Sequence, residues 1–85
     1  MKLSVLYFAA LRERIGRAEE AVNAPDSVAN VAQLREWLAQ RGAPWREAFA
    51  ETRRVRAAVD QAMVDDLHPL HDGAEVAFFP PVTGG

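Results

Sequence analysis

The sequence contains no cysteine, which excludes disulfide bonds, thiolate metal sites and a cysteine nucleophile. It also lacks a long apolar run. The longest uninterrupted stretch, Val5 to Leu11, is far shorter than the roughly 20 residues that a membrane-spanning helix needs. The N-terminus shows no secretory cleavage pattern. These absences predict a cytoplasmic protein without a membrane span.

An excess of charge of one sign is missing as well. Ten Lys and Arg residues stand against twelve Asp and Glu residues, a net charge of -2, so nucleic acid, which requires a basic surface, is not an expected partner. With 49% hydrophobic and 26% charged residues over 85 positions, the composition is typical of one small globular domain. We predict a folded domain over residues 1–81 and a flexible C-terminal tail over residues 82–85.

Apolar periodicity separates the expected strands from the expected helices. Leu3, Val5 and Tyr7 alternate with their neighbours, as in a strand with one buried face. A main helix of about 14 residues is expected to begin at Ser27, a good N-cap residue, and to end near Gly42. In chain order, the predicted elements are strands at 2–8, 18–22, 55–59, 62–64 and 75–79, and helices at 9–15, from 27 to about 41, and from 44 onward.

This order of elements favours an α+β fold in which a mixed sheet has one main helix packed across one face. One helix covers only one face, so the other face is predicted to be open. Alternation places Leu6, Phe8 and Phe79 on the open face, and Met63 is expected to join them. Such residues are either scattered surface hydrophobes or, if clustered, a docking patch for a partner.

The C-terminal residues form a distinct segment. Pro80 and Pro81 cannot donate hydrogen bonds to a sheet, so pairing should stop there and the residues from Val82 to Gly85 should project from the domain. Glycines without side chains fit a narrow channel in a partner enzyme. A free terminal carboxylate is a poor acyl donor until it is activated, and adenylation by ATP is the obvious route. The alternative is a frayed glycine terminus without function.

Residues Val76–Gly85 resemble the C-terminal signature of the small subunit of molybdopterin synthase, the MoaD family. Further segments extend the resemblance over nearly the whole chain: Leu6–Ala9 with Leu11–Glu13, Ala57–Gln61, and His68–Leu70 before Asp72-Gly73. The resemblance implies the ubiquitin-like β-grasp fold and the function of a sulfur carrier.

The resemblance also implies a role for the tail. Gly85 would be adenylated with ATP by an E1-like adenylyltransferase (MoeB-like) and converted to a thiocarboxylate with sulfur from a sulfurtransferase or cysteine desulfurase. The large synthase subunit (MoaE-like) would supply the catalytic groups and pass this sulfur to cyclic pyranopterin monophosphate. No tightly bound cofactor is expected on this chain. The residues implied are Val82, Thr83 and Gly84 for threading into the large subunit, and Phe8, Met63, Phe79, Pro80 and Pro81 for binding it.

Two other functions remain open from the sequence. An activated Gly85 could be joined to lysine amines, as in a ubiquitin-like modifier, or could supply sulfur to thiamine or tRNA pathways. A β-grasp interaction module with an inert tail is the third possibility. Asp60 and Ala74 depart from the family pattern, where Asn and Asp are usual, and both positions bear on turn stability or partner affinity.

Other polar and aromatic groups are predicted to have structural roles. His68 and His71 lie in a predicted loop that would not fix metal ligands, so no metal site is expected. The arginines near position 55 favour a solvated strand edge, with an acidic partner surface as the alternative. The residues concerned are Arg53, Arg54 and Arg56 at this edge, Trp37 and Trp45 packing in the core, and Glu19 and Glu20 at the surface.

Overall fold

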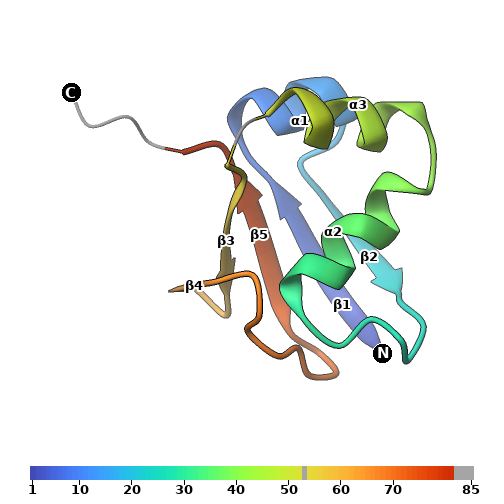
Figure 1. The fold of residues 1–85 in the computed structure, drawn as a ribbon, viewed down its shortest axis with the longest axis vertical. Coiled ribbons are helices and arrows are strands. Elements are labelled where there is room, and N and C mark those ends of the chain that lie inside the picture. Colours follow the sequence, from blue (N-terminus) through green and yellow to red (C-terminus); the bar gives the residue numbers. More distant parts are fainter. Residues whose placement is uncertain (53, 82–85) are drawn as a thin grey trace.

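The computed structural model describes residues 1–52 and 54–81. It contains five strands and three helices within these residues (Figure 1). Each predicted strand is present: the last two have the predicted bounds, and no bound of the other three differs by more than one residue. The elements are β1 (Lys2–Tyr7), α1 (Ala9–Ile15), β2 (Glu19–Asn23), α2 (Val31–Ala39), α3 (Ala43–Glu51), β3 (Arg56–Val59), β4 (Ala62–Val64) and β5 (Glu75–Phe79).

The five strands form one mixed sheet in the order β2-β1-β5-β3-β4. The first and last strands, β1 and β5, lie side by side and parallel, while the other neighbouring pairs are antiparallel (Figure 1). A parallel pair requires a long crossover connection, and here the crossover carries the helices. The predicted α+β class with a mixed sheet is therefore confirmed.

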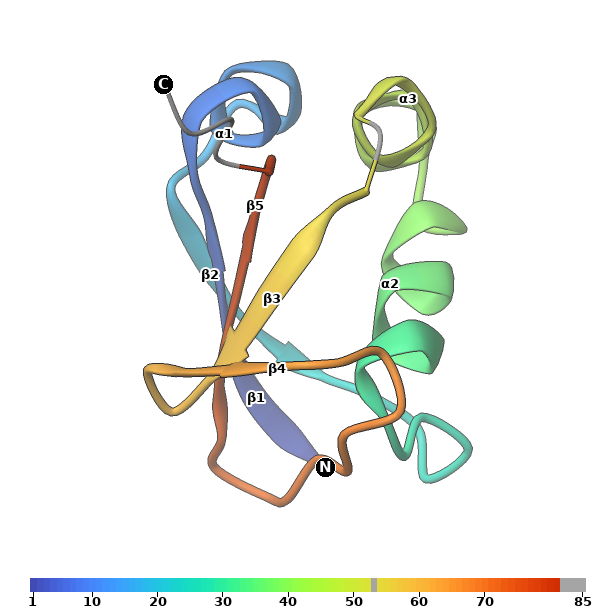
Figure 2. The same ribbon diagram turned by 60° about the vertical axis from the view of Figure 1, so that its left-hand side comes forward.

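The hydrophobic core lies on one face of the sheet. Leu3, Val5 and Tyr7 of β1 are buried, as their alternation predicted, and Val76 and Phe78 of β5 lie beside them. Helices α2 and α3 lie on the same side of the sheet (Figure 2). The buried side chains that the helices contribute are Leu11 and Ile15 from α1, Val31, Leu34 and Leu38 from α2, and Ala48 from α3.

The main helix begins later than Ser27, where the sequence placed its cap. Asn30 is the N-cap of α2: its side chain accepts a hydrogen bond from the Gln33 amide at 2.9 Å, and the Gln33 side chain accepts one from the Asn30 amide at 3.2 Å. This reciprocal capping box satisfies amides that the first turn leaves unpaired. Ser27 instead lies in a preceding turn. Helix α2 is therefore nine residues long rather than about 14, and α3 has the same length.

A two-residue turn joins β3 to β4, as predicted. Asp60 and Gln61 both have positive φ, 49° and 71°, and the flanking residues Val59 and Ala62 pair across the hairpin. Aspartate adopts this left-handed conformation more readily than most residues, so the departure from Asn is compatible with the turn. In the described part of the chain, no helix has the length and apolar character needed to cross a membrane.

Candidate partner-docking face

The face of the sheet opposite the core carries a continuous row of apolar side chains. Register aligns Leu6 of β1 with Ala77 of β5, Ala77 with Ala58 of β3, and Ala58 with Met63 of β4. Met63, at the β4 edge, is 55% exposed. We call the surface that these aligned residues form the open face of the sheet.

Two phenylalanines extend the open face at the end of the sheet where β5 terminates. Phe79 is the last residue of β5, is half-buried and pairs with Arg56 of β3. Phe8 directly follows β1, is 46% exposed, and its amide donates to the Phe78 carbonyl at 3.1 Å. The structure thus brings Leu6, Phe8, Met63 and Phe79 to one face, as alternation predicted.

The half-buried Pro80 and Pro81 follow Phe79 directly, and β5 ends at Phe79 as the prolines predicted. The chain therefore leaves the sheet beside the two phenylalanines. Val82, Thr83, Gly84 and Gly85, the predicted tail and its reactive terminus, lie outside the described residues.

The open face is suited to binding rather than to chemistry. Its central row consists of alkyl and thioether side chains, which neither transfer protons nor act as nucleophiles under ordinary conditions. Aromatic and methionine side chains are enriched where proteins bury a partner's surface.

A protein-family model described as "ThiS family" matches residues 5–85 of the sequence. The chain belongs to the ThiS family. Its curated relatives include the molybdopterin synthase sulfur carrier subunit of Escherichia coli, 43% identical over 98% of this chain and 99% of the relative. The protein of the same name from Haemophilus influenzae is 41% identical over the same shares of both chains.

Solved structures resemble this ThiS-family chain over 96% or more of its length. A putative molybdopterin converting factor, subunit 1, from Pyrococcus furiosus has a TM-score of 0.78 and 33% identity, covering 96% of this chain and 99% of its own. A complex of subunits 1 and 2 of the molybdopterin-converting factor from Helicobacter pylori gives 0.66 and 26%, with full coverage of both chains. SAMP1 from Haloferax volcanii, at 21% identity, 0.76 and full coverage of both, shows the shared fold alone. The predicted ubiquitin-like β-grasp fold is confirmed.

One polar cluster of this ThiS-family chain was missed by the sequence interpretation. Glu20 of β2 was expected at the surface, but its side chain is only 6% exposed. Its Oε2 accepts hydrogen bonds from the Tyr7 hydroxyl at 2.7 Å and the Trp45 Nε1 at 3.1 Å. Its Oε1 accepts from Arg41 at 2.8 Å and from Arg17 at 3.3 Å. These donors come from β1, from the α1–β2 connection, from the α2–α3 connection and from α3, and no local sequence pattern predicts that they meet.

The cluster around Glu20 also fixes the position of Trp45. Trp45 and Trp37 are partly buried against the hydrophobic core, as predicted. Trp45 in addition donates to Glu20 and lies under the Arg41 guanidinium, 4.4 Å from the ring centroid. Burial raises the pKa of Glu20, but hydrogen bonds from Tyr7, Arg41 and Trp45 outweigh it and leave the pKa below its usual value. A charged carboxylate thus ties α3 to the β1–β2 edge.

The two positions that depart from the family pattern, Asp60 and Ala74, have different surroundings. Asp60 accepts a hydrogen bond from the Glu75 amide at 3.0 Å, and its other oxygen lies 2.7 Å from His71 Nε2. Ala74 is fully buried, and its carbonyl accepts from the Ser4 amide at 3.0 Å. Asp60 thus links the β3–β4 hairpin to the loop before β5, whereas Ala74 packs in the core.

Proposed function

We propose that this chain is the sulfur-carrier subunit of a molybdopterin synthase. The observation that carries the proposal is the full-length likeness to relatives that bear this name, at up to 43% identity. The Gly84-Gly85 ending and the open apolar face beside the end of β5 support it, because a carrier needs a reactive terminus and a surface for its enzymes.

In this proposal Gly85 carries the chemistry. Its carboxylate attacks the α-phosphorus of ATP and releases pyrophosphate, which converts a poor acyl donor into an acyl-adenylate. A persulfide of the sulfur donor then attacks the carbonyl carbon and displaces AMP, which gives an acyl disulfide. A thiol cleaves its S–S bond, the thiocarboxylate is released, and the thiol is oxidised to a disulfide with the donor's sulfur. Sulfur is softer and more nucleophilic towards carbon than oxygen, so the thiocarboxylate suits sulfur transfer to cyclic pyranopterin monophosphate. The ATP and pterin sites belong to partner enzymes.

The open face is the proposed docking surface for these partners. Phe8, Met63 and Phe79 would contact the large synthase subunit, and Pro80 and Pro81 would direct the tail into its active site. The H. pylori complex of subunits 1 and 2 supports a partner of this kind for the present chain. An E1-like adenylyltransferase and a sulfurtransferase or cysteine desulfurase are the other proposed partners.

The test is the intact mass of the protein after incubation with ATP, an E1-like adenylyltransferase and a sulfur source. We expect a mass gain equal to the difference between sulfur and oxygen, confined to the peptide that ends in Gly85. A matched control carries one serine added after Gly85, which leaves residues 1–85 unchanged but removes the reactive terminus. The control should show no exchange.

Other outcomes would contradict the proposal. Failure of the wild-type chain to exchange oxygen for sulfur would overturn sulfur carriage. Isopeptide-linked conjugates of Gly85 in a cell extract, without transfer of sulfur to the pterin, would favour the protein modifier instead.

A further inference from the structure

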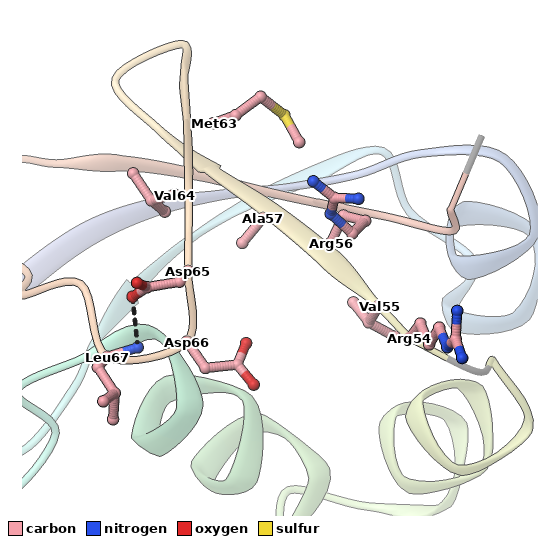
Figure 3. A pocket seen from close by; sticks show the side chains of 9 residues that line it. All are labelled: Arg54, Val55, Arg56, Ala57, Met63, Val64, Asp65, Asp66 and Leu67. Atoms are coloured by element: carbon pink, nitrogen blue, oxygen red, sulfur yellow. Dashed lines mark hydrogen bonds between the residues drawn. The ribbon is translucent and has the colours of Figure 1, made fainter. Parts of the chain in front are cut away.

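A groove of about 730 Å³ opens where β4 diverges from β3 (Figure 3). The last cross-strand pair is Ala57 with Val64. Beyond it, residues 65–67 line one side of the groove and residues 54–56 line the other side. The groove thus lies along the edge of β3 beyond the last residue that pairs with β4. Met63 lies at both the groove and the open face, so the two surfaces are continuous.

The main chain of Val55 is positioned to accept a new strand. Asp60 donates its amide to the Glu75 carbonyl of β5, and the groups of successive residues in a strand alternate in direction. Val55 directly precedes β3, and continuing this alternation by one residue directs its amide and carbonyl toward the groove, as those of Ala57 and Val59 are directed toward β4. Among the hydrogen bonds between described residues, none involves the Val55 main chain. An extended peptide lying in the groove would supply the missing partners.

The charges that line the groove differ in how they are compensated. On the side of the groove that carries the two aspartates, Asp66 forms a bidentate ion pair with Arg35, with N–O distances of 3.0 and 3.1 Å. The Asp65 side chain accepts a hydrogen bond from the Leu67 amide at 3.0 Å. Arg54 and Arg56 lie on the other side of the groove, and the ion pairs between described residues include neither of them. Asp65 is in none of these ion pairs either, so two arginine charges and one carboxylate charge remain in the groove, and the excess is positive.

We propose that this groove binds an acidic, extended peptide segment of another protein, which pairs with Val55 as an added strand and places carboxylates beside Arg54 and Arg56. In antiparallel pairing, the peptide residue opposite Val55 points to the same face as the Val55 side chain, so the peptide carries apolar residues at these positions. The peptide residues between them point to the opposite face, where the register places Arg56, and these are the acidic residues. Peptide binding at this groove is separate from sulfur carriage by Gly85.

The test is a titration of the isotopically labelled, full-length chain with an acetylated and amidated heptapeptide in which Glu alternates with Ile and Val. We expect saturable amide shifts at Val55, Val64 and Leu67, with a dissociation constant below about 1 mM, as for weak transient complexes. Raising the ionic strength from about 0.01 to 0.15 M should weaken binding, because the Debye length falls from about 30 to 8 Å.

Three matched controls separate strand addition from general charge attraction. N-methylation of the peptide's Ile and Val residues removes the amides that face Val55 and should abolish the shifts, and Lys in place of Glu should do the same. Arg56→Gln and Arg54→Gln should each weaken binding by about threefold, while Arg46→Gln on α3 should not. Absence of saturable shifts, equal binding of the methylated peptide, or shifts centred on β2 would overturn the proposal and leave these arginines as a protected strand edge.

Discussion

Phe78 and Phe79 are adjacent in β5 but point to opposite faces of the sheet. Phe78 is fully buried and packs edge-on against Phe49 of α3, with ring centroids 5.4 Å apart, whereas Phe79 is half-buried on the open face. The same chemical change at these two positions therefore separates folding from binding.

The first prediction uses this contrast. Phe79→Ala should lower affinity for the large synthase subunit by about 2 kcal/mol or more, because truncating an interface aromatic removes its buried contacts. Its free energy of unfolding, from urea denaturation, should change little. Phe78→Ala should instead destabilise the domain by about 3–5 kcal/mol through the cavity it leaves. If Phe79→Ala unfolds the domain while binding per folded molecule is unchanged, Phe79 belongs to the core and its assignment to the docking face is wrong.

The buried carboxylate of Glu20 is the second feature at the scale of single residues. Glu20→Gln replaces one acceptor oxygen by an amide group that donates, so two of the four donors around it lose their acceptor. We expect a loss of about 2 kcal/mol in the free energy of unfolding, as for hydrogen bonds to charged groups. Glu19→Gln, at the exposed neighbouring position, is the matched control and should change stability by less than about 0.5 kcal/mol. Equal effects of the two substitutions would contradict the role assigned to Glu20.

At the scale of elements, strands were easier to predict than helix ends. Alternation in β1 and β5 is a local signal, and the prolines after Phe79 and the turn at Asp60-Gln61 mark strand ends with residues whose backbone preferences are strong. The start of α2 depends on distant residues as well. The amides of Val31 and Ala32 donate to the carbonyls of His68 and Asp66, at 3.2 and 2.9 Å. Ser27 and Asn30 are comparable caps in sequence, and the loop that supplies these carbonyls favours Asn30.

The third prediction tests this helix start. Asn30→Ala should lower the free energy of unfolding by about 1 kcal/mol, because the Gln33 amide loses its acceptor. Ser27→Ala should have a much smaller effect, since Ser27 precedes the helix. Urea denaturation of both variants measures the difference. A larger loss for Ser27→Ala would move the cap back to the position first predicted from the sequence.

The candidate docking face could be predicted only in part. The face assignment of Leu6 and Phe79 followed from period-two alternation, which any strand imposes. The groove beside β3 could not be foreseen, because it depends on where β4 diverges from its neighbour after Val64. Nor could the sequence reveal the Glu20 cluster, whose hydrogen-bond donors Tyr7 and Trp45 are 13 and 25 residues away.

At the scale of the whole molecule, the loop before β5 makes contacts at the end of the sheet where β5 begins. The Lys2 amide donates to the Asp72 side chain at 2.6 Å, and the Gly73 amide donates to the Lys2 carbonyl at 2.7 Å. The Asp60–His71 pair joins the β3–β4 hairpin to this same loop. The loop before β5 therefore contacts β1 through the Lys2 main chain and the β3–β4 hairpin through Asp60.

The fourth prediction concerns the pH dependence of stability. The hydrogen bond to Asp60 raises the pKa of His71 above its ordinary value of 6.5, and the Glu75 amide, followed by His71, lowers the pKa of Asp60 below 3.8. The folded state thus binds the His71 proton more tightly than the unfolded state does. This contribution is fully present below pH 6.5 and is lost as the pH rises through the raised pKa. The contribution of Asp60 is present above pH 3.8 and is lost as the pH falls through its lowered pKa.

Both contributions therefore coexist between about pH 4 and 6.5, and the free energy of unfolding should decrease modestly from pH 6.5 to 8. His71→Gln should flatten this decrease, because glutamine has no proton to lose. His68→Gln is the matched control, since His68 is also exposed but does not contact Asp60, and it should retain the wild-type slope. Urea denaturation at a series of pH values measures the slopes. Equal slopes for His71→Gln and the wild type would show that the Asp60–His71 pair contributes nothing to the stability of the fold.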